Sequence, residues 1–221
     1  MSEGIRIVTA GGTGQVIEKK SRFIAQVMPV RSEEEALDFI NAVKKKYWDA
    51  RHNCYAFTVG DRFELTRSSD DGEPSGTAGK PILEVLLNEG VHNCAVVVTR
   101  YFGGTLLGTG GLIRAYQAAT VEGLSASEIS VKYSGFLYTV TCDYNSIGKI
   151  QYQLANDGIA ALDTRYTDVV SCDLALTEEQ SSRLLPALTE ITAGKAVIEK
   201  KDAIEFLIND DKKGGASCHL L

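Results

Sequence analysis

The stretch from Ser68 to Tyr116 constrains the fold of this chain more than any other part of it. Its second half begins with the most β-like run in the sequence, Val91 to Arg100, which predicts a central strand. Five glycines follow between Gly103 and Gly111, and the apolar spacing from Leu112 to Val121 then predicts a helix. Glycine tolerates positive φ angles and a close approach of the backbone. We therefore expect a strand, a shaped loop and a helix, with a loop that does more than connect them.

The residues before this stretch supply further elements of the same domain. Ser32 and Glu35 form the capping box of a helix that we expect to reach Lys46. The Gly-Gly-Thr-Gly run at 11–14 resembles a phosphate loop only superficially, because a strand rather than a helix follows it, so we expect a flexible lead-in. The other expected elements are two strands within 14–30 that turn near Lys20, a strand at 51–59 paired with 62–67 across Gly60, and a helix from Pro81 to Gly90.

The second half of the chain has a different texture, which begins with small polar residues between Ser125 and Ser134. Beyond this expected boundary the pattern predicts strand 135–142, helix 145–156, strands 159–166 and 168–176, helix 178–191 and strand 196–207. That order, βαββαβ, is the split βαβ arrangement of a ferredoxin-like domain. We therefore expect an α+β protein with domains at 1–134 and 135–210, followed by a flexible tail at 211–221.

The charge of the chain is distributed unevenly along its length. The net charge is −6, but residues 1–135 hold 15 Lys and Arg against 16 Asp and Glu, whereas residues 136–221 hold 8 against 13. An anionic partner is therefore expected to meet the first part. The five cysteines are scattered and form no CxxC motif, which is typical of a reducing cytoplasm, and no apolar run is long enough for a membrane span. We expect a cytoplasmic protein with no membrane partner.

An acidic loop opens the constraining stretch. Asp70, Asp71 and Glu73 place three carboxylates within four residues, a spacing compatible with Mg²⁺ or Ca²⁺. The same residue types form Asx turns and helix caps without a metal, and we expect no cofactor, with Mg²⁺ at Asp70–Glu73 as the alternative. Ser75 and Thr77 lie among glycines, where they are either nucleophiles or, as we expect, loop hydroxyls that bind the backbone.

A repeated H-x-C pattern occurs at His52 with Cys54 and at His92 with Cys94. Residues two apart on a strand share a face, so each pair predicts either half of a zinc site or a Cys–His nucleophile. Cys94 opens an apolar strand, however, and buried free thiols behave as small hydrophobic side chains. We expect structural cysteines and no metal.

The glycine-rich loop is the strongest candidate for a binding site. Arg100 and Tyr101 precede it and Arg114 follows it on the expected helix, whose N-terminal N–H groups attract anions. Arginine offers bidentate contacts to phosphate, and an exposed aromatic ring stacks on a base. The alternative is a tight turn in which Arg100 and Arg114 pair with Asp70, Asp71 or Glu73. The expected anion contacts are Arg51, His52, Lys80, Arg100, Tyr101, Gly103, Gly104, Gly108, Gly110, Gly111 and Arg114.

Several motifs together resemble a known family. They are R-H-N-C-Y-A-F at 51–57, S-D-D-G-E-P-S-G-T-A-G-K-P-I-L at 69–83, V-V-V-T-R-Y-F-G-G-T-L-L-G-T-G-G-L-I-R-A-Y at 96–116, and K-K-S-R-F-I-A at 19–25. These strings closely resemble the IMPACT family in its bacterial YigZ-type form. The resemblance implies an N-terminal α/β sandwich like domain 2 of ribosomal protein S5 and a ferredoxin-like C-terminal domain, a pair that is similar to the last two domains of elongation factor G. It also implies that eukaryotic members regulate translation by binding the activator of a stress kinase.

These observations leave two hypotheses of function from different classes. The first is a cytoplasmic, non-enzymatic regulator that binds RNA, the ribosome or a translation factor, with Arg51, Lys80, Arg100 and Arg114 meeting phosphates. The second is an enzyme for a small phosphorylated or peptide-like ligand, with Asp70, Asp71 and Glu73 as a metal or acid–base site and His52 assisting. The likeness of a fold to RNA-binding proteins leaves function open.

Overall fold

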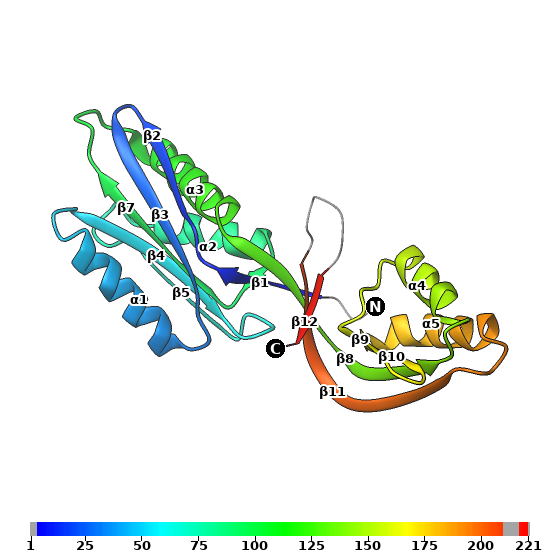
Figure 1. The fold of residues 1–221 in the computed structure, drawn as a ribbon. Coiled ribbons are helices and arrows are strands. Elements are labelled where there is room, and N and C mark those ends of the chain that lie inside the picture. The colour runs from blue at the N-terminus through cyan, green and yellow to red at the C-terminus, as the bar shows by residue number, and fades with distance from the viewer. Residues whose placement is uncertain (1–3, 210–216, 221) are drawn as a thin grey trace. The chain divides into compact units, whose positions relative to one another are not determined.

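A computed structural model describes residues 4–209 and 217–220 of the chain. The chain divides into two compact units, one formed by residues 5–129 and the other beginning at Ser130. The division lies a few residues before the expected boundary between 134 and 135. Each unit has its own hydrophobic core, and the expected fold class, α+β with two domains, is confirmed (Figure 1).

The N-terminal unit is built on a five-stranded antiparallel sheet with the strand order β2-β3-β7-β4-β5. Alternate residues of each strand point to opposite faces of the sheet, so that Val96 and Val98 of β7 belong to one core cluster and Ala95 and Val97 to another. The strands are β2 (Thr13–Glu18), β3 (Ser21–Pro29), β4 (His52–Val59), β5 (Leu65–Ser69) and β7 (Cys94–Tyr101).

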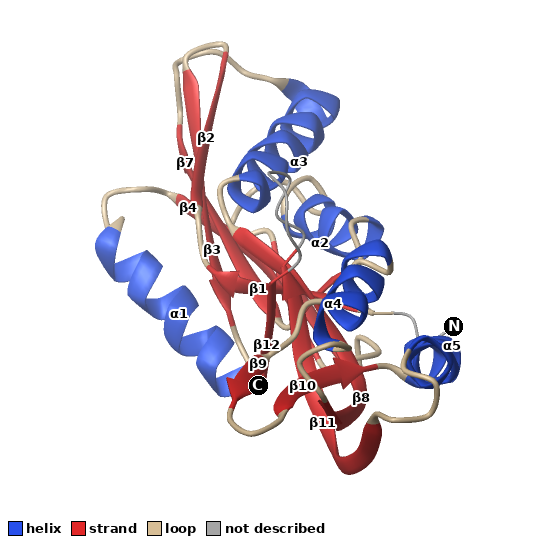
Figure 2. Ribbon diagram, turned by 45° about the vertical axis from the view of Figure 1, so that its right-hand side comes forward, coloured by secondary structure: helices blue, strands red, loops and turns tan. Residues whose placement is uncertain are grey.

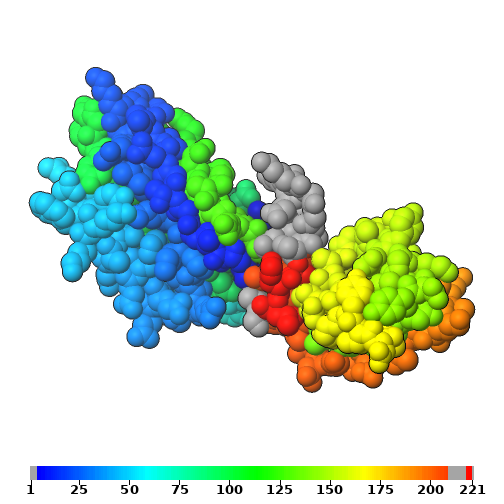
Figure 3. All heavy atoms as spheres, viewed as in Figure 1, coloured from blue at the N-terminus to red at the C-terminus, as the bar shows by residue number. Residues whose placement is uncertain are grey.

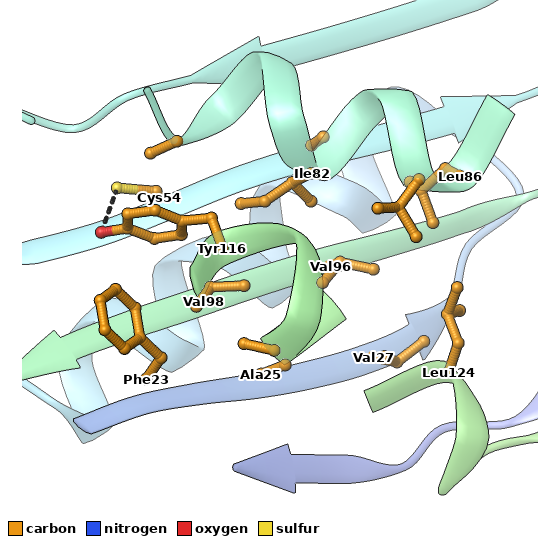
Figure 4. Close-up of a cluster of buried hydrophobic side chains, with 14 of the residues drawn as sticks. Phe23, Ala25, Val27, Cys54, Ile82, Leu86, Val96, Val98, Tyr116 and Leu124 are labelled. Carbon is orange, nitrogen blue, oxygen red and sulfur yellow. Dashed lines mark hydrogen bonds between the residues drawn. The ribbon is translucent and has the colours of Figure 1, made fainter. Parts of the chain in front are cut away.

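Helices cover both faces of this sheet, as Figure 2 shows. Helix α1 packs on β4 and β7 through Ala36, Ile40 and Val43, and the Ser32 hydroxyl caps it by accepting from Glu35 N–H. Helices α2 and α3 pack on the opposite face around Ile82, which is buried with Tyr116 and Phe23 (Figure 4). The helices are α1 (Glu33–Lys46), α2 (Gly79–Asn88) and α3 (Gly108–Ser125).

The expectation of a flexible lead-in at 11–14 was wrong. A strand, β1 (Ile5–Ala10), precedes these residues and pairs in parallel with the short strand β6 (Val91–His92). The carbonyl of Gly12 accepts a hydrogen bond from Val27 N–H over 2.9 Å, and a Cβ on Gly11 would lie 2.0 Å from the Val27 carbonyl oxygen. The glycines are therefore required for close backbone packing on β3.

Helix α3 begins at Gly108, inside the glycine-rich segment, rather than at the expected Leu112. Glycine is a poor helix former, but a helix is stabilised mainly by the packing of its apolar face. Tyr116 and Ala119 are fully buried against the sheet, and this contact holds the helix in place. Gly108, Gly110 and Gly111 thus lie in its first turn, where the N–H groups of Gly108 and Gly110 have no partner within the helix.

The C-terminal unit has the ferredoxin-like arrangement that the sequence predicts. Its sheet is antiparallel with the order β11-β8-β10-β9, and α4 and α5 pack together over the apolar core that includes Ile150, Leu174 and Leu184. Thr177 caps α5 in a complete capping box with Gln180. The elements are β8 (Glu128–Cys142), α4 (Ile147–Asn156), β9 (Asp163–Tyr166), β10 (Val170–Leu176), α5 (Glu178–Ile191) and β11 (Val197–Asn209).

The expectation of a flexible tail at 211–221 requires a correction for its described part. Residues 217–220 form strand β12 (Ser217–Leu220), which pairs antiparallel with β11 so that Phe206 lies opposite Leu220. Residues 211–216 and 221 lie outside the described residues. No helix in the described part of the chain is both long enough and apolar enough to cross a membrane.

Candidate functional site

A buried ion pair lies between the acidic loop and the central strand. Arg100 Nη1 donates to Glu73 Oε1 over 2.7 Å, and the side chains are only 8% and 3% exposed. The Tyr116 hydroxyl donates to the same oxygen over 2.8 Å and accepts from Cys54 Sγ over 3.3 Å (Figure 4). Burial is the main cause that raises the pKa of both Tyr116 and Cys54, so the two groups stay protonated in this network.

The ion pair with Glu73 places the Arg100 side chain in the interior of the N-terminal unit. Of the two alternatives for Arg100, pairing with an acidic-loop residue is the one found, and the partner is Glu73. The guanidinium also lies 5.4 Å and 5.6 Å from the ring centroids of Phe23 and Phe102. Its Nε is buried and has no hydrogen-bond partner among the described residues. A side chain enclosed in this way holds the loop against the sheet rather than meeting a phosphate at the surface.

Asp70 organises the acidic loop through its backbone. Its Oδ1 accepts from Ala78 N–H over 3.0 Å and Gly79 N–H over 2.8 Å, and its Oδ2 accepts from Gly76 N–H over 2.8 Å. Burial raises the pKa of Asp70, but the three backbone donors together hold it below its ordinary value. Gly79 and Ala78 lie at the start of α2, so the carboxylate stabilises the beginning of that helix.

Asp71 faces a different direction from Asp70. Its Oδ2 accepts from Asn53 N–H over 2.7 Å, and its Oδ1 accepts from Lys44 Nζ over 2.6 Å. His52 Nδ1 lies 3.0 Å from the Asp71 carbonyl oxygen, a geometry in which the ring N–H donates. Asp71 has a φ of 42°, in the left-handed region that aspartate tolerates. These contacts fix the loop to β4 and α1.

The carboxylates of this loop do not converge on a common point. Asp70, Asp71 and Glu73 each bind different partners, and no group of three or more His, Cys, Asp or Glu suited to a metal ion occurs within residues 4–209 and 217–220. The contacts of Asp70 and Asp71 are of the Asx-turn and helix-capping kind. Neither hydroxyl of the loop is placed beside a base: Thr77 is buried and donates to the Pro74 carbonyl over 2.6 Å, and Ser75 is exposed.

The two H-x-C pairs lie apart on the sheet. Cys54 lies beside Asp70 and Tyr116, whereas Cys94 pairs in register with Thr58. At 3.3 Å per residue, that register separates the two thiols by about 13 Å along β4. Burial raises the pKa of Cys94 to about 12, so it behaves as a buried hydrophobic residue. The arrangement brings together neither four zinc ligands nor a reactive thiolate.

The glycine-rich loop and the β2–β3 turn form one exposed end of the N-terminal unit. A Cβ on Gly103 would lie 2.0 Å from the backbone carbonyl carbon of Lys20, and Gly103 N–H donates to Ser21 Oγ over 3.0 Å. In Figure 3 the blue atoms of the turn and the green atoms of the loop are contiguous at the upper left. The loop also carries Leu106, which is 83% exposed. We call Lys19, Lys20, Gly103–Gly111 and Arg114 the glycine-loop surface.

The N-terminus of α3 belongs to this surface. Leu107 occupies the N-cap position, no described side chain caps the helix, and its first turn contains no acidic residue. Arg114 is exposed one turn further on, and no described residue forms an ion pair with it. Gly104 and Gly108 are exposed and have φ angles of 83° and 70°, which glycine adopts without strain. Unlike Arg100, these groups are available to a ligand.

Three more of the expected anion contacts are Tyr101, Arg51 and Lys80. Tyr101 donates from its hydroxyl to Asp49 over 2.7 Å and carries the Arg22 guanidinium 4.8 Å above its ring. Arg51 is exposed and immediately precedes β4. Lys80 is exposed on α2, where its Nζ lies 3.8 Å from Glu84. The pairing of His52 with Arg100 brings the neighbouring residues Arg51 and Tyr101 to the same end of the sheet, whereas Lys80 lies on α2.

Sequence reasoning missed several exposed cations and one aromatic residue of this end. The exposed cations are Lys19, Lys20 and Arg22, and the aromatic residue is Trp48, which is 82% exposed. The available signal was the Lys-Lys-Ser-Arg run at a hairpin turn, because a turn exposes its side chains. The elements that lie beside that turn are brought there by the pairing of strands that are distant in sequence, so the run alone does not identify them.

Two known protein domains match most of this chain in sequence. The domain family described as the Impact N-terminal domain matches residues 19–124, and a domain of unknown function (DUF1949) matches residues 140–195. IMPACT family member YvyE of Bacillus subtilis (strain 168) is 37% identical over 208 residues, which cover 93% of this chain and 96% of that protein. This chain belongs to the IMPACT family. The resemblance seen in the motifs is thereby confirmed.

Two further relatives of this IMPACT-family chain extend the comparison. IMPACT family member YigZ of Escherichia coli (strain K12) is 35% identical over 178 residues, covering 80% of this chain and 87% of that protein. A crystal structure titled as that of an hypothetical protein is 33% identical, with a TM-score of 0.57, and covers 91% of this chain and 99% of its own. Both domains of the IMPACT-family chain are therefore represented in its bacterial relatives.

Proposed function

We propose that this protein is a non-enzymatic cytoplasmic regulator of translation that binds ribosomal RNA through its glycine-loop surface. The observation that carries the proposal is the uncapped N-terminus of α3, whose first turn consists of small residues beside the exposed cation Arg114. Backbone N–H groups at a helix N-terminus bind phosphate, and glycine lets the phosphate approach closely. The family resemblance, which implies that eukaryotic members regulate translation, supports a role in the same process.

Each part of the surface has a distinct role in this proposal. The α3 N–H groups and the Arg114 guanidinium bind one phosphate, and Lys19 and Lys20 of the adjacent turn neutralise the next. Tyr101 with its stacked Arg22, together with the exposed Trp48, offers faces on which unpaired bases stack. Arg51 and Lys80 remain proposed secondary contacts. Arg100 supports the surface from within through Glu73.

The contacts of the acidic loop favour this proposal over the enzyme hypothesis. Asp70 and Asp71 accept backbone N–H groups and a lysine, and Glu73 is buried with Arg100, so each carboxylate has a structural partner. A general base must lie within hydrogen-bond reach of a substrate proton, whereas these carboxylates are already bound to groups of the protein itself. Nothing in the described residues favours a second candidate function.

The test compares sedimentation with ribosomes and binding to naked ribosomal RNA across a salt series. A Lys20→Ala/Arg114→Ala variant is compared with a matched control, Lys149→Ala/Arg183→Ala, which removes two exposed cations of the C-terminal unit. We expect wild type and control to bind both targets at low salt. Two lost phosphate contacts should reduce the slope of log affinity against log salt by about 1.4 to 1.8.

Three outcomes would contradict the proposal. If wild type binds neither target, the surface has another ligand. If it binds ribosomes but not naked RNA, a ribosomal protein or a translation factor is the partner. If the control loses as much affinity as the Lys20/Arg114 variant, binding reflects general charge and not this surface.

A further inference from the structure

One half of the N-terminal sheet is exposed on the side that carries α1. Helix α1 packs on β4 and β7, whereas most side chains of β2 and β3 that point to the same side are exposed (Figure 1). Directly opposed residues of paired strands share a face, and Gln26 of β3 lies opposite Val97, which packs under α1. We call the residues of this half the open sheet face: Thr13, Gln15 and Ile17 of β2, Arg22, Ile24, Gln26 and Met28 of β3, and Tyr101 of β7.

The open sheet face combines apolar surface with amide groups. Ile17 and Met28 are 64% and 46% exposed, and the exposed Gln15 precedes Ile17 by two residues on β2, which places it on the same face. The distance along β3 from Arg22 to Met28 is about 20 Å at 3.3 Å per residue. The face is therefore long enough for an extended ligand.

Cations stacked on tyrosine rings lie at one end of this face. The Arg22 guanidinium lies 4.8 Å from the ring centroid of Tyr101, and Lys46 Nζ lies 5.2 Å from that of Tyr47. The turn that follows α1 contacts the first of these pairs, since Asp49 Oδ1 accepts from the Tyr101 hydroxyl over 2.7 Å. Two aromatic rings, each with its own cation, thus border one end of the open sheet face.

The charge of the open sheet face favours an anionic ligand. Arg22 is its one charged residue, and Lys46 adds a second cation because its Nζ donates to Gln26 Oε1 over 3.1 Å. The carboxylate of Asp49 is engaged by the Tyr101 hydroxyl. Glu18, at the end of β2, alternates to the opposite side of the sheet. The face therefore attracts anions.

These groups are the ones with which proteins bind unpaired nucleotides. Unstacked bases stack on aromatic rings and on guanidinium planes, cations bind the phosphates, and amides can both donate to and accept from base edges. Open sheets that carry aromatic residues stack two or three bases in other RNA-binding domains. The bases of a duplex stack on each other, so their faces are not free to stack on the protein. A face of this composition therefore favours a single strand over a duplex.

We propose that the open sheet face binds a single-stranded segment of RNA, with bases stacked on Arg22, Tyr101 and Trp48. Trp48 is 82% exposed and precedes Asp49 in the turn that contacts Tyr101. The strand reaches this face from the glycine-loop surface around the β2–β3 turn, since Arg22 follows Lys20 by two residues. The inference rests on the proposed function for its choice of RNA, and it adds that the RNA is unpaired and where its bases bind.

The first test compares one short fluorescein-labelled RNA strand, chosen to have no self-complementarity, with the same strand annealed to its complement. Fluorescence anisotropy with the full chain should show that the single strand binds about tenfold more tightly than the duplex, because stacking on the protein requires free bases. Trp48→Ala should lower the affinity for the single strand about fivefold or more, without changing its salt dependence, because it removes a stacking ring and no charge.

A double variant tests the stacked pair. Arg22→Gln/Tyr101→Leu should lower the affinity for the single strand more than Trp48→Ala does. Its matched control is Arg183→Gln/Tyr152→Leu, which removes an exposed cation and an exposed tyrosine from the helices of the C-terminal unit and should bind as wild type does. Far-UV circular dichroism confirms that each variant is folded, and Trp48→Ala changes only an exposed side chain.

Trp48 also reports on the ligand directly, because it is the only tryptophan of the chain. A base that stacks on its ring should quench its fluorescence, so the unlabelled single strand should quench it to saturation. Inorganic polyphosphate, which has phosphates but no bases, should leave the fluorescence unchanged. Quenching is therefore a signal of bases at this face and not of anion binding in general.

The outcomes separate this inference from the proposed function. Equal binding of single strand and duplex, or single-strand affinity that neither variant lowers, would overturn the inference and leave RNA binding by the glycine-loop surface in place. Polyphosphate that binds as tightly as the single strand would also overturn it. Loss of binding in Arg22→Gln/Tyr101→Leu but not in Lys20→Ala/Arg114→Ala would support it and contradict the glycine-loop surface. Binding of neither RNA would overturn both proposals.

Discussion

Arg100 and Glu73 form a buried ion pair over 2.7 Å that connects the central strand β7 to the acidic loop. The residues are 27 positions apart in the chain, so the pair closes a long loop onto the sheet. Replacing both partners of a buried pair by apolar residues is often tolerated, whereas removing one leaves an uncompensated charge in the interior. Removing one partner therefore measures the cost of leaving the other buried and unpaired.

We expect Glu73→Ala to lower the free energy of unfolding by about 3 to 5 kcal/mol, because Arg100 would be left buried and unpaired. Urea titration followed by circular dichroism measures the change. Glu84→Ala is the control, since it removes the carboxylate of the exposed Lys80–Glu84 pair and should cost about 0 to 1 kcal/mol. Similar costs for the two variants would show that the Glu73 pair does not hold the loop.

Asp70 should make the stability of the protein sensitive to acid. Its native pKa lies below the unfolded value of about 3.9, because its three backbone N–H donors outweigh the effect of burial. Ionised Asp70 therefore stabilises the fold above that value, and the contribution is lost as the pH falls through the native pKa. We expect Asp70→Asn to cost about 1 to 3 kcal/mol at pH 7 and clearly less at pH 3. A cost that does not change between the two pH values would contradict this assignment.

Two glycines of the glycine-loop surface should respond to alanine in opposite ways. A Cβ on Gly103 meets the Lys20 backbone at 2.0 Å, so Gly103→Ala must displace the loop or the turn and should destabilise the protein. A Cβ on Gly110 meets only the flexible end of Arg114, at 3.6 Å, and the position is helical. Gly110→Ala should therefore stabilise the fold by about 0.5 to 1 kcal/mol. Thermal unfolding of both variants provides the comparison.

If the proposed RNA site is correct, Gly110→Ala should also weaken RNA binding while the fold becomes more stable, because a methyl group then lies among the N–H groups of the first turn. Unchanged binding by this stabilised variant would mean that the phosphate does not approach the helix end closely.

The buried cysteines should be unreactive in the native protein. Cys54, Cys94 and Cys172 are fully or almost fully buried, and burial raises the pKa of Cys94 to about 12 and of Cys172 to about 11. Since only the thiolate is nucleophilic, we expect slow labelling of these three by a disulfide reagent at pH 8 and rapid labelling in denaturant. Mass spectrometry of the labelled peptides identifies the sites. Fast native labelling of Cys54 would show that the acidic loop opens readily.

Local signals predicted the starts of α1 and α5, because the interactions behind them are local. Ser32 and Thr177 cap α1 and α5 through the N–H three residues further on, as the sequence pattern indicates. The βαββαβ order likewise follows from hydrophobic periodicity and turn residues. These parts of the fold involve contacts within a few residues of each other.

Elements held by distant contacts were not predictable in the same way. Strand β1 is stabilised by parallel pairing with β6, and β12 by pairing with β11, and neither partner is indicated by the short segment itself. The sequence offered Asp70, Asp71 and Glu73 as equivalent partners for Arg100, and only the packing of the loop beneath Tyr116 selects Glu73.

Strand β2 lies at one end of the order β2-β3-β7-β4-β5, and within the described residues only β3 pairs with it. Its outer edge therefore presents unpaired N–H and C=O groups beside Ile17, which is 64% exposed. An edge of this kind invites a strand from a second molecule, and lysines nearby oppose such stacking through their charge. Lys19 and Lys20 at the end of this edge thus serve solubility in addition to any ligand, and neutralising both should make concentrated protein prone to aggregation.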